Sequence, residues 1–435
     1  MSNYLLDREF TKNHHLSVDG GEPAIPKNAR KTIYPVITQE DGLHVTNIIG
    51  LKDRGVSEVQ KLTQEYREYV GANFAIPTAS GTSSLHIALA GAGIQPGDEV
   101  ITTALTFIAT AMAILHVKAI PIFADIDPRT FCIDSQAVEK LITSKTKAIM
   151  PVHVHGLPAD MTALKALAKK YHLKIIEDAS HAHSAKINNQ VCGSLGDTAG
   201  QSLMADKNYF VGGEGGMAFF STEESFELAK KYLIDNGIQY DMSWVAATLG
   251  RSQLKRLPYY DAIRSRNADY LSKKLIETGG FIPPHVPEGY AHAYNMYRII
   301  IDPIGLGLDD IPVGRLKEAI KLLLLEEGVP AREWQNAPIP SHKPFCNRLG
   351  WGKSYPWCLS SRTDFGYEQN NFPKLLQVLE STLVLCRELR SPVEFERVER
   401  YIYAFEKIKK NKDRLAQLAR SLSYTPCFNK DPRLG

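Results

Sequence analysis

The chain of 435 residues lacks the features that define several large classes of protein. No run approaches about eighteen apolar residues, the length of a membrane span, and the opening MSNYLLDREFTKNHH has no apolar signal core. The 51 basic and 48 acidic residues leave a net charge of only +3, too weak a field to indicate nucleic acid as the main partner. The sequence also has no internal repeat and no low-complexity tract.

Paired cysteines are missing as well. The six cysteines form no CxxC pair, so neither a zinc site nor a disulfide framework is indicated. They are Cys132, Cys192, Cys346, Cys358, Cys386 and Cys427. Scattered thiols of this kind are typical of reducing compartments, and we expect a cytoplasmic protein.

The composition is that of an ordinary globular protein, with 44% hydrophobic and 23% charged residues. Short apolar runs at 119–126, 147–156 and 172–179 alternate with helical patterns at 135–144 and 161–172. This alternation predicts an α/β fold, in which a large three-layer domain has a mostly parallel sheet covered on both faces. Later patterns predict a smaller α+β C-terminal domain. The expected boundaries are an N-terminal arm at 1–35, a large domain at 36–270 and a small domain at 271–435.

Ligands of such sheets bind at the carboxyl ends of the strands, where three candidate groups lie. Ser80-Gly81-Thr82 precedes a helical pattern, a place that suits a phosphate but also an ordinary helix cap. Asp178 lies at the end of the apolar run IIED, where a carboxylate needs a cation or hydrogen-bond donors, and a structural role is an equal alternative. Lys207 stands before four glycines between 212 and 216, a better setting for an imine-forming lysine than for a surface one.

One cofactor needs all three groups. Pyridoxal phosphate has a phosphate for a helix N-terminus, a ring nitrogen that prefers a carboxylate partner, and an aldehyde that reacts with lysine. The order of phosphate loop, aspartate and lysine in one α/β domain is far more specific than any single element. Neither a Gly-Lys-Ser/Thr phosphate loop nor a GxGxxG dinucleotide motif is found where it would be required.

With these residues in place, the chain resembles the DegT/StrS-type sugar aminotransferases over nearly its whole length. These are pyridoxal-phosphate enzymes of the aspartate-aminotransferase fold (fold type I). The resemblance is carried by SGTSSLHIALAGAGIQPGDEVITTALTFIATA (80–111), IIEDASHAHSA (175–185), DKNYFVGGEGG (206–216) and GIQYDMSWVAATLGRSQLKRL (237–257).

The resemblance implies a ping-pong transaminase. It would move an amino group from glutamate or glutamine to a keto-sugar or keto-cyclitol, in the biosynthesis of amino sugars, antibiotics or surface glycans. It also implies a homodimer whose active sites are shared between the subunits. Two alternatives stay open. A pyridoxamine-dependent sugar dehydratase of the same fold carries histidine where Lys207 stands here, and a cofactor-binding regulator without turnover is allowed by the motif changes described below.

Carried over residue by residue, the resemblance implies that Lys207 forms the imine and transfers the proton. It also implies that Asp178 pairs with the pyridine nitrogen. The expected phosphate ligands are Gly81, Thr82 and Ser202, and Phe107 is expected to stack on the ring, with a plain core phenylalanine as the alternative.

The chain departs from the family pattern at three positions. His181 stands where glutamine is common near the ring hydroxyl, and it can still hydrogen-bond there. In the segment 237–242, Gln239 replaces an asparagine that reaches the phosphate of the neighbouring subunit's cofactor. Asp241 replaces an arginine and reverses its charge, so recognition of a carboxylate or phosphate is not carried over to this position.

Two further patterns have ordinary interpretations. His153 and His155 in PVHVHG lack additional ligands at metal-binding spacing, so we expect no metal and place both imidazoles at a strand end beside the cofactor. The basic cluster Lys407, Lys409, Lys410 and Lys412 is predicted to be a solvated helix end. Residues that choose the acceptor are expected in loops 26–36, 236–244 and 334–345, but nothing there specifies one sugar.

Overall fold

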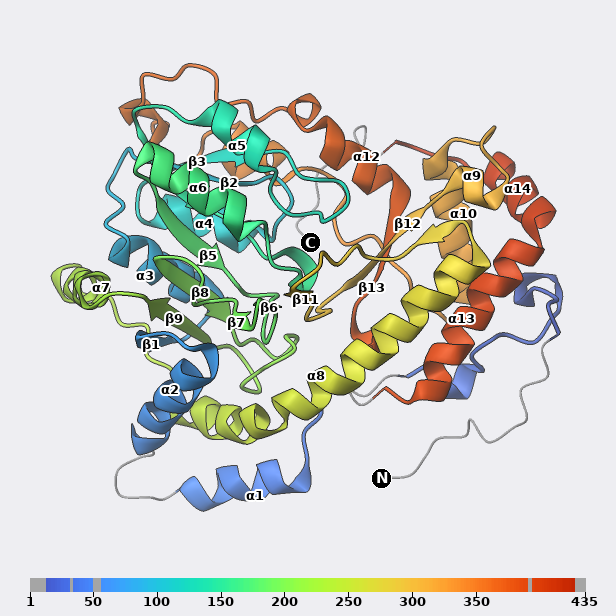
Figure 1. Ribbon diagram of the computed structural model, residues 1–435, viewed down its shortest axis with the longest axis horizontal. Helices are drawn as coiled ribbons and strands as arrows, with labels where there is room; N and C mark the ends of the chain where they lie inside the picture. The colour runs from blue at the N-terminus through green and yellow to red at the C-terminus, as the bar shows by residue number, and fades with distance from the viewer. Residues whose placement is uncertain (1–12, 32–33, 50–55, 390–392, 427–435) are drawn as a thin grey trace.

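The computed structural model describes residues 13–31, 34–49, 56–389 and 393–426. Its large sheet has seven strands in the order β1-β9-β8-β5-β4-β2-β3 (Figure 1). They are β1 (Phe74–Thr78), β2 (Glu99–Thr103), β3 (Ile120–Ala124), β4 (Thr146–Met150), β5 (Lys174–Asp178), β8 (Thr198–Ser202) and β9 (Gly216–Phe220). Every neighbouring pair is parallel except those of β9, which runs antiparallel to β1 and β8. The predicted α/β class with a mostly parallel sheet is confirmed.

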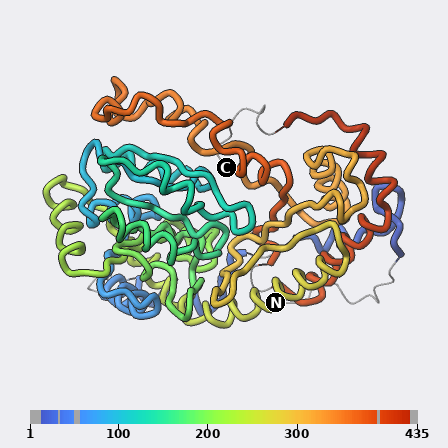
Figure 2. Tube along the Cα trace, turned by 45° about the horizontal axis from the view of Figure 1, so that its top comes forward, coloured from blue at the N-terminus to red at the C-terminus, as the bar shows by residue number. Residues whose placement is uncertain are grey.

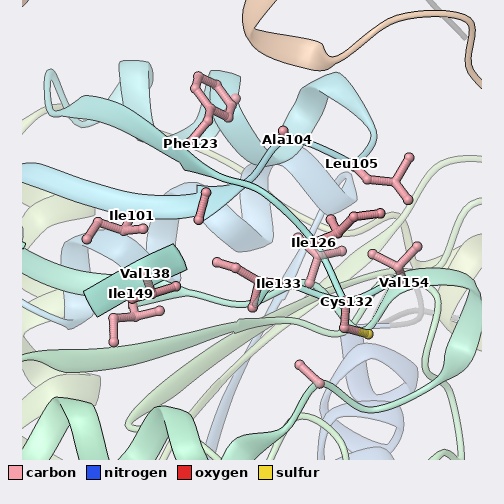
Figure 3. Packing of buried hydrophobic residues seen from close by; sticks show 14 of the residues in the cluster. Ile101, Ala104, Leu105, Phe123, Ile126, Cys132, Ile133, Val138, Ile149 and Val154 are labelled. Carbon is pink, nitrogen blue, oxygen red and sulfur yellow. The ribbon is translucent and has the colours of Figure 1, made fainter. Parts of the chain in front are cut away.

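The strands are largely buried because helices cover both faces of this sheet. All five residues of β2, β3 and β9 are buried. The helices around the sheet are α2 (Val56–Val70), α3 (Gly81–Gly91), α4 (Ile108–His116), α5 (Ser135–Leu141), α6 (Met161–Tyr171), α7 (Glu223–Asp235) and the start of α8 (Trp244–Thr278). Adjacent strand residues point to opposite faces: Val100 packs with α3, whereas Ile101 and Ile149 join the cluster that contains Val138 of α5 (Figure 3).

Helix α8 leads away from the large sheet to a second, smaller sheet (Figure 1). This sheet is antiparallel, in the order β10 (Phe281–Ile282), β12 (Tyr297–Ile301), β13 (Thr382–Leu385). It shares a hydrophobic cluster with α10 (Val313–Glu326), α13 (Phe395–Lys410) and α14 (Lys412–Ser421). The expected boundary near residue 270 lies inside α8, and the division into domains stays a prediction.

Residues 336–379 leave the small sheet and return to the large one, where they lie over the edge formed by β3 (Figure 2). The segment includes α11 (Lys343–Cys346) and α12 (Pro373–Ser381). Phe345 and Tyr367 pack edge-to-face on Phe123, with ring centroids 5.4 and 5.5 Å away, and the Tyr367 hydroxyl donates to the carbonyl of Pro121. A third small sheet joins β11 (Tyr290–Ala291), β6 (Lys186–Ile187) and β7 (Gln190–Val191).

The prediction of a solvated helix end is wrong for Lys407. Its side chain is fully buried, and its ammonium lies 2.7 Å from the carboxylate of Glu327, which is buried as well. That carboxylate also accepts the backbone N–H groups of Ser17 and Ala24, each at 2.8 Å. The N-terminal segment therefore covers the side of α13 that the helical pattern alone indicated as exposed.

Across the described ranges, no helix combines the length and the apolar character needed to cross a bilayer.

Candidate active site

A cavity of about 210 Å³ lies at the carboxyl ends of β5 and β8, beside the first turns of α3 and α4. Of the predicted site residues, it is lined by Gly81, Thr82, Phe107, Asp178, His181, Ser202 and Lys207. Gln239 is exposed and does not line it. The topology thus brings together three groups that are spread between residues 81 and 207 of the sequence, because parallel strands end at the same edge of the sheet.

The start of α3 forms one wall of the cavity. Ser80 is the N-cap, and its hydroxyl accepts the N–H of Ser83 at 3.2 Å, while the following N–H groups of Gly81 and Thr82 have no partner within the helix. A Cβ added to Gly81 would lie 2.4 Å from the Cβ of Ser202, so only glycine fits where the helix meets the end of β8. Capping and anion binding are therefore compatible here, since they use different groups of the same turn.

Asp178, at the end of β5, also lines the cavity and has only 4% of its surface exposed. One carboxylate oxygen accepts the hydroxyl of Thr110 at 2.6 Å, and the other accepts the N–H of Ser180 at 3.0 Å. Among the described residues Asp178 has no basic partner, so these two hydrogen bonds orient a buried negative charge without neutralising it. Such a charge is costly unless a cation lies against it, and a protonated ring nitrogen in the cavity would be that cation.

Lys207 belongs to a turn that runs from the end of β8 to the start of β9. Backbone hydrogen bonds close the turn, from Leu203 N–H to Gly215 at 2.8 Å and from Ala205 N–H to Gly213 at 2.8 Å. A Cβ on Gly216 would lie 2.2 Å from the carbonyl oxygen of Ser80. The glycines predicted to allow a tight turn thus also let the turn lie directly against the N-cap of α3, and Lys207 lines the cavity from there.

The expectation that His153 and His155 lie beside the cofactor is wrong, because neither lines the cavity. After β4 the chain enters a short 3₁₀ turn (Val154–Gly156) that directs both rings into the protein. His153 accepts the N–H of Ala159 on Nδ1, so its Nε2 donates to the carboxylate of Glu177 at 2.8 Å. Ligand atoms of His153, Glu177 and Cys192 lie within 4.8 Å of one another, but these hydrogen bonds already occupy the first two.

His155 is a neutral acceptor. Its Nε2 accepts the guanidinium N–H of Arg298 at 2.9 Å, and burial, followed by the charge of Arg298, holds the pKa of the imidazole well below its ordinary value. The indole of Trp334 stands nearly perpendicular to the rings of both His155 and His181, at centroid distances of 4.8 and 5.6 Å. His181 does line the cavity, so Trp334 and His155 form the packing behind it.

Phe107 is 46% exposed, which excludes the alternative of a plain core phenylalanine. Other lining residues were missed, among them Thr110, Ser180 and Glu214. The sequence does contain a signal for Thr110, which is a hydroxyl residue in the first turn of the mostly apolar helical stretch IATAMAILH. Glu214 also had one, because it is the only charged side chain among the four glycines.

The donor set fits pyridoxal phosphate. A helix N-terminus flanked by hydroxyls faces one part of the cavity, a buried carboxylate without a basic partner faces another, and a lysine amine enters from the glycine-rich turn. Together with the mostly parallel sheet, these groups define the class: a pyridoxal-phosphate-dependent enzyme of fold type I.

Comparison with known proteins identifies the family. The model of the DegT/DnrJ/EryC1/StrS aminotransferase family matches residues 50–345. The chain is 34% identical over 289 residues to a UDP-N-acetyl-3-dehydro-alpha-D-glucosamine 3-aminotransferase of Acidithiobacillus ferrooxidans, covering 63% of this chain and 72% of that protein. It is 36% identical over 256 residues to the L-glutamine:2-deoxy-scyllo-inosose aminotransferase of Streptomyces lividus, covering 54% and 60%.

A solved structure agrees. The aminotransferase from Psychrobacter cryohalolentis superposes with a TM-score of 0.75 at 25% identity, over 88% of this chain and 99% of that one. The chain belongs to the DegT/DnrJ/EryC1/StrS aminotransferase family.

Proposed function

We propose that the enzyme moves an amino group from glutamate or glutamine to a keto-sugar or keto-cyclitol, in amino-sugar, antibiotic or surface-glycan biosynthesis. One relative is named for a UDP-linked dehydro amino sugar and another for L-glutamine and a deoxy-inosose, which supports this range of substrates. The observation that carries the proposal is that the start of α3, Asp178 and Lys207 surround one cavity.

In this proposal each group has a separate task. Bound pyridoxal phosphate supplies an aldehyde that takes up the amino group and a ring that accepts the electron pair of the broken bond. Lys207 would hold the aldehyde carbon and, when the donor amine displaces it, would carry the proton away from the α-carbon of the donor and return it to the cofactor. Asp178 would keep the ring nitrogen protonated, because a buried carboxylate favours a cation beside it.

The other lining residues would orient the cofactor. The N–H groups of Gly81 and Thr82 and the hydroxyl of Ser202 would bind the phosphate, with the helix dipole adding to their attraction. Phe107 would cover one face of the ring, which is consistent with its exposure to the cavity. His181, backed by Trp334, would hydrogen-bond the ring hydroxyl.

We also propose that the enzyme works as a homodimer in the cytoplasm. Gln239 is exposed and lies outside the cavity of its own chain, which supports a role in the cavity of a partner. Large apolar side chains at and beside α1 (Gln39–Ile48) are also exposed, namely Ile37, Leu43 and Ile49. Light scattering of the purified protein tests the assembly, and an active monomer would contradict it.

The function is tested in separate half-reactions. The protein loaded with pyridoxal phosphate is mixed with glutamate or glutamine, and loss of the visible cofactor band is followed. A panel of keto-sugars and keto-cyclitols is then added, and the acceptor is the one that restores the band. Lys207→Ala should abolish both changes, whereas Lys231→Ala, which removes an exposed lysine of α7, should leave them intact. A band that no amino donor changes would contradict the proposal.

A further inference from the structure

The turn that carries Lys207 is bonded to three distant segments through three consecutive residues. Asp206 pairs with Arg387 at 2.8 Å, and the side-chain amide of Asn208 donates to the carbonyl of Ala293 at 2.7 Å. Between them, the backbone carbonyl of Lys207 itself accepts a hydrogen bond from the hydroxyl of Tyr34. The partners come from the N-terminal segment, the approach to β12 and the stretch after β13, so tertiary folding alone assembles this arrangement.

Tyr34 is held in a defined position. Its ring meets the ring of buried Phe210 edge-to-face, with centroids 6.0 Å apart and an angle of 64°. Two residues further on, the carbonyl of Val36 accepts the side-chain amide of Gln253 from α8 at 3.1 Å. Packing on one side and this tether on the other direct the hydroxyl of Tyr34 toward the lysine turn.

The hydroxyl acts on the peptide group that follows Lys207. Fixing that carbonyl fixes the plane of the peptide between Lys207 and Asn208, and the buried amide of Asn208 holds the next residue from the other side. The direction in which the lysine side chain leaves the backbone is therefore set. A lysine has a long flexible stem, so an anchored base reduces the space that its amine can search.

We propose that Tyr34 is a positioning residue for Lys207. It is not among the residues that line the cavity, and it acts through the backbone carbonyl of the lysine. The inference rests on the proposed function, in which Lys207 holds the cofactor. The ion pair of Asp206 with Arg387 is not assigned this role, because the two side chains are 37% and 49% exposed and ion pairs in contact with solvent contribute little.

The test compares Tyr34→Phe, which removes only the hydroxyl, with two controls in the full-length protein. Tyr259→Phe changes a tyrosine that is 66% exposed on α8, and Arg387→Ala removes the neighbouring contact to the same turn. In Tyr34→Phe, amide hydrogen exchange across 205–216 should become faster, and pyridoxal phosphate should bind about two- to ten-fold more weakly, the range expected for one neutral hydrogen bond. The pH midpoint of the visible cofactor band should also move, while both controls stay near the wild type.

The inference is overturned if Tyr34→Phe exchanges amides and binds cofactor like the wild type, or if Arg387→Ala produces an equal effect. Should Tyr34→Phe fail to fold, a second variant, Phe210→Leu, takes its place. It loosens the packing against the ring of Tyr34 and keeps the Tyr34 hydroxyl, and it must weaken cofactor binding. Borohydride reduction and peptide mapping of the wild type separate this result from the proposed function. If the reduced cofactor is found on another lysine, the proposed function fails, and if it is found on Lys207, only the role of Tyr34 is at stake.

Discussion

Replacing Asp178 with asparagine removes one buried negative charge and changes little else at the cofactor site. Asparagine keeps the size of the side chain and an oxygen that can still accept the N–H of Ser180. Thr110 can turn its hydroxyl to accept from the new amide. Two unit charges about 4 Å apart interact by about 4 kcal/mol at an effective dielectric constant of about 20, the value that suits partly buried sites. We therefore expect the half-reaction with the amino donor to slow by about a thousand-fold.

The assay is a single turnover of the cofactor-loaded protein with glutamate or glutamine, followed by the loss of the visible band in a stopped-flow instrument. Asp309→Asn is the matched control, because it removes the same charge from an exposed position outside the cavity. The reasoning is refuted if Asp178→Asn reacts within about ten-fold of the wild type, since that would leave no more than about 1.4 kcal/mol for the charge. Equal losses in both variants would assign the effect to net charge instead.

Two predictions concern stability. Lys407→Met should lower the free energy of unfolding by about 3–5 kcal/mol in urea titrations, because it leaves the carboxylate of Glu327 buried without its cation. The control Lys410→Met, at an exposed position, should lower it by less than about 0.5 kcal/mol. Similar losses in the two variants would contradict the buried-pair argument. Burial, followed by the charge of His116, lowers the pKa of His86 from 6.5 to about 4, so its neutral form stabilises the fold fully above pH 6.5, and this contribution should decline as the pH falls toward 4. In urea titrations between pH 7 and pH 4.5, the free energy of unfolding should depend less steeply on pH for His86→Gln than for the wild type. Identical slopes would refute the contribution of His86.

The order of motifs along the chain was enough to predict the cofactor and most of the cavity. A phosphate loop before a helix, an aspartate at a strand end and a lysine before glycines each have a local signature. The short apolar runs and the helical patterns between them predicted the parallel sheet, and a parallel sheet gathers the ends of its strands at one edge. Gly81, Asp178 and Lys207 could thus be placed together without any knowledge of the contacts between them.

The wrong predictions for His153, His155 and Lys407 share one cause. His153 and His155 follow a strand, as a ligand would, but a 3₁₀ turn directs both rings inward to Glu177 and Arg298. Lys407 lies in an amphipathic helix whose apparently polar side is covered by the N-terminal segment. In each case the partner comes from a distant part of the chain, and local periodicity carries no information about it.

By itself, the sequence determined the fold class, the cofactor and most of the predicted residues that line the cavity, because each of these depends on residue types at short spacing. Only the tertiary structure decided which groups support those residues. Thr110 orients Asp178 from 68 positions away, and Tyr34 reaches the carbonyl of Lys207 from 173 positions away. Such contacts form only when separate elements pack, since the hydrogen-bonding capacity of a threonine or a tyrosine is the same wherever it stands. The path of the backbone alone selects its partner.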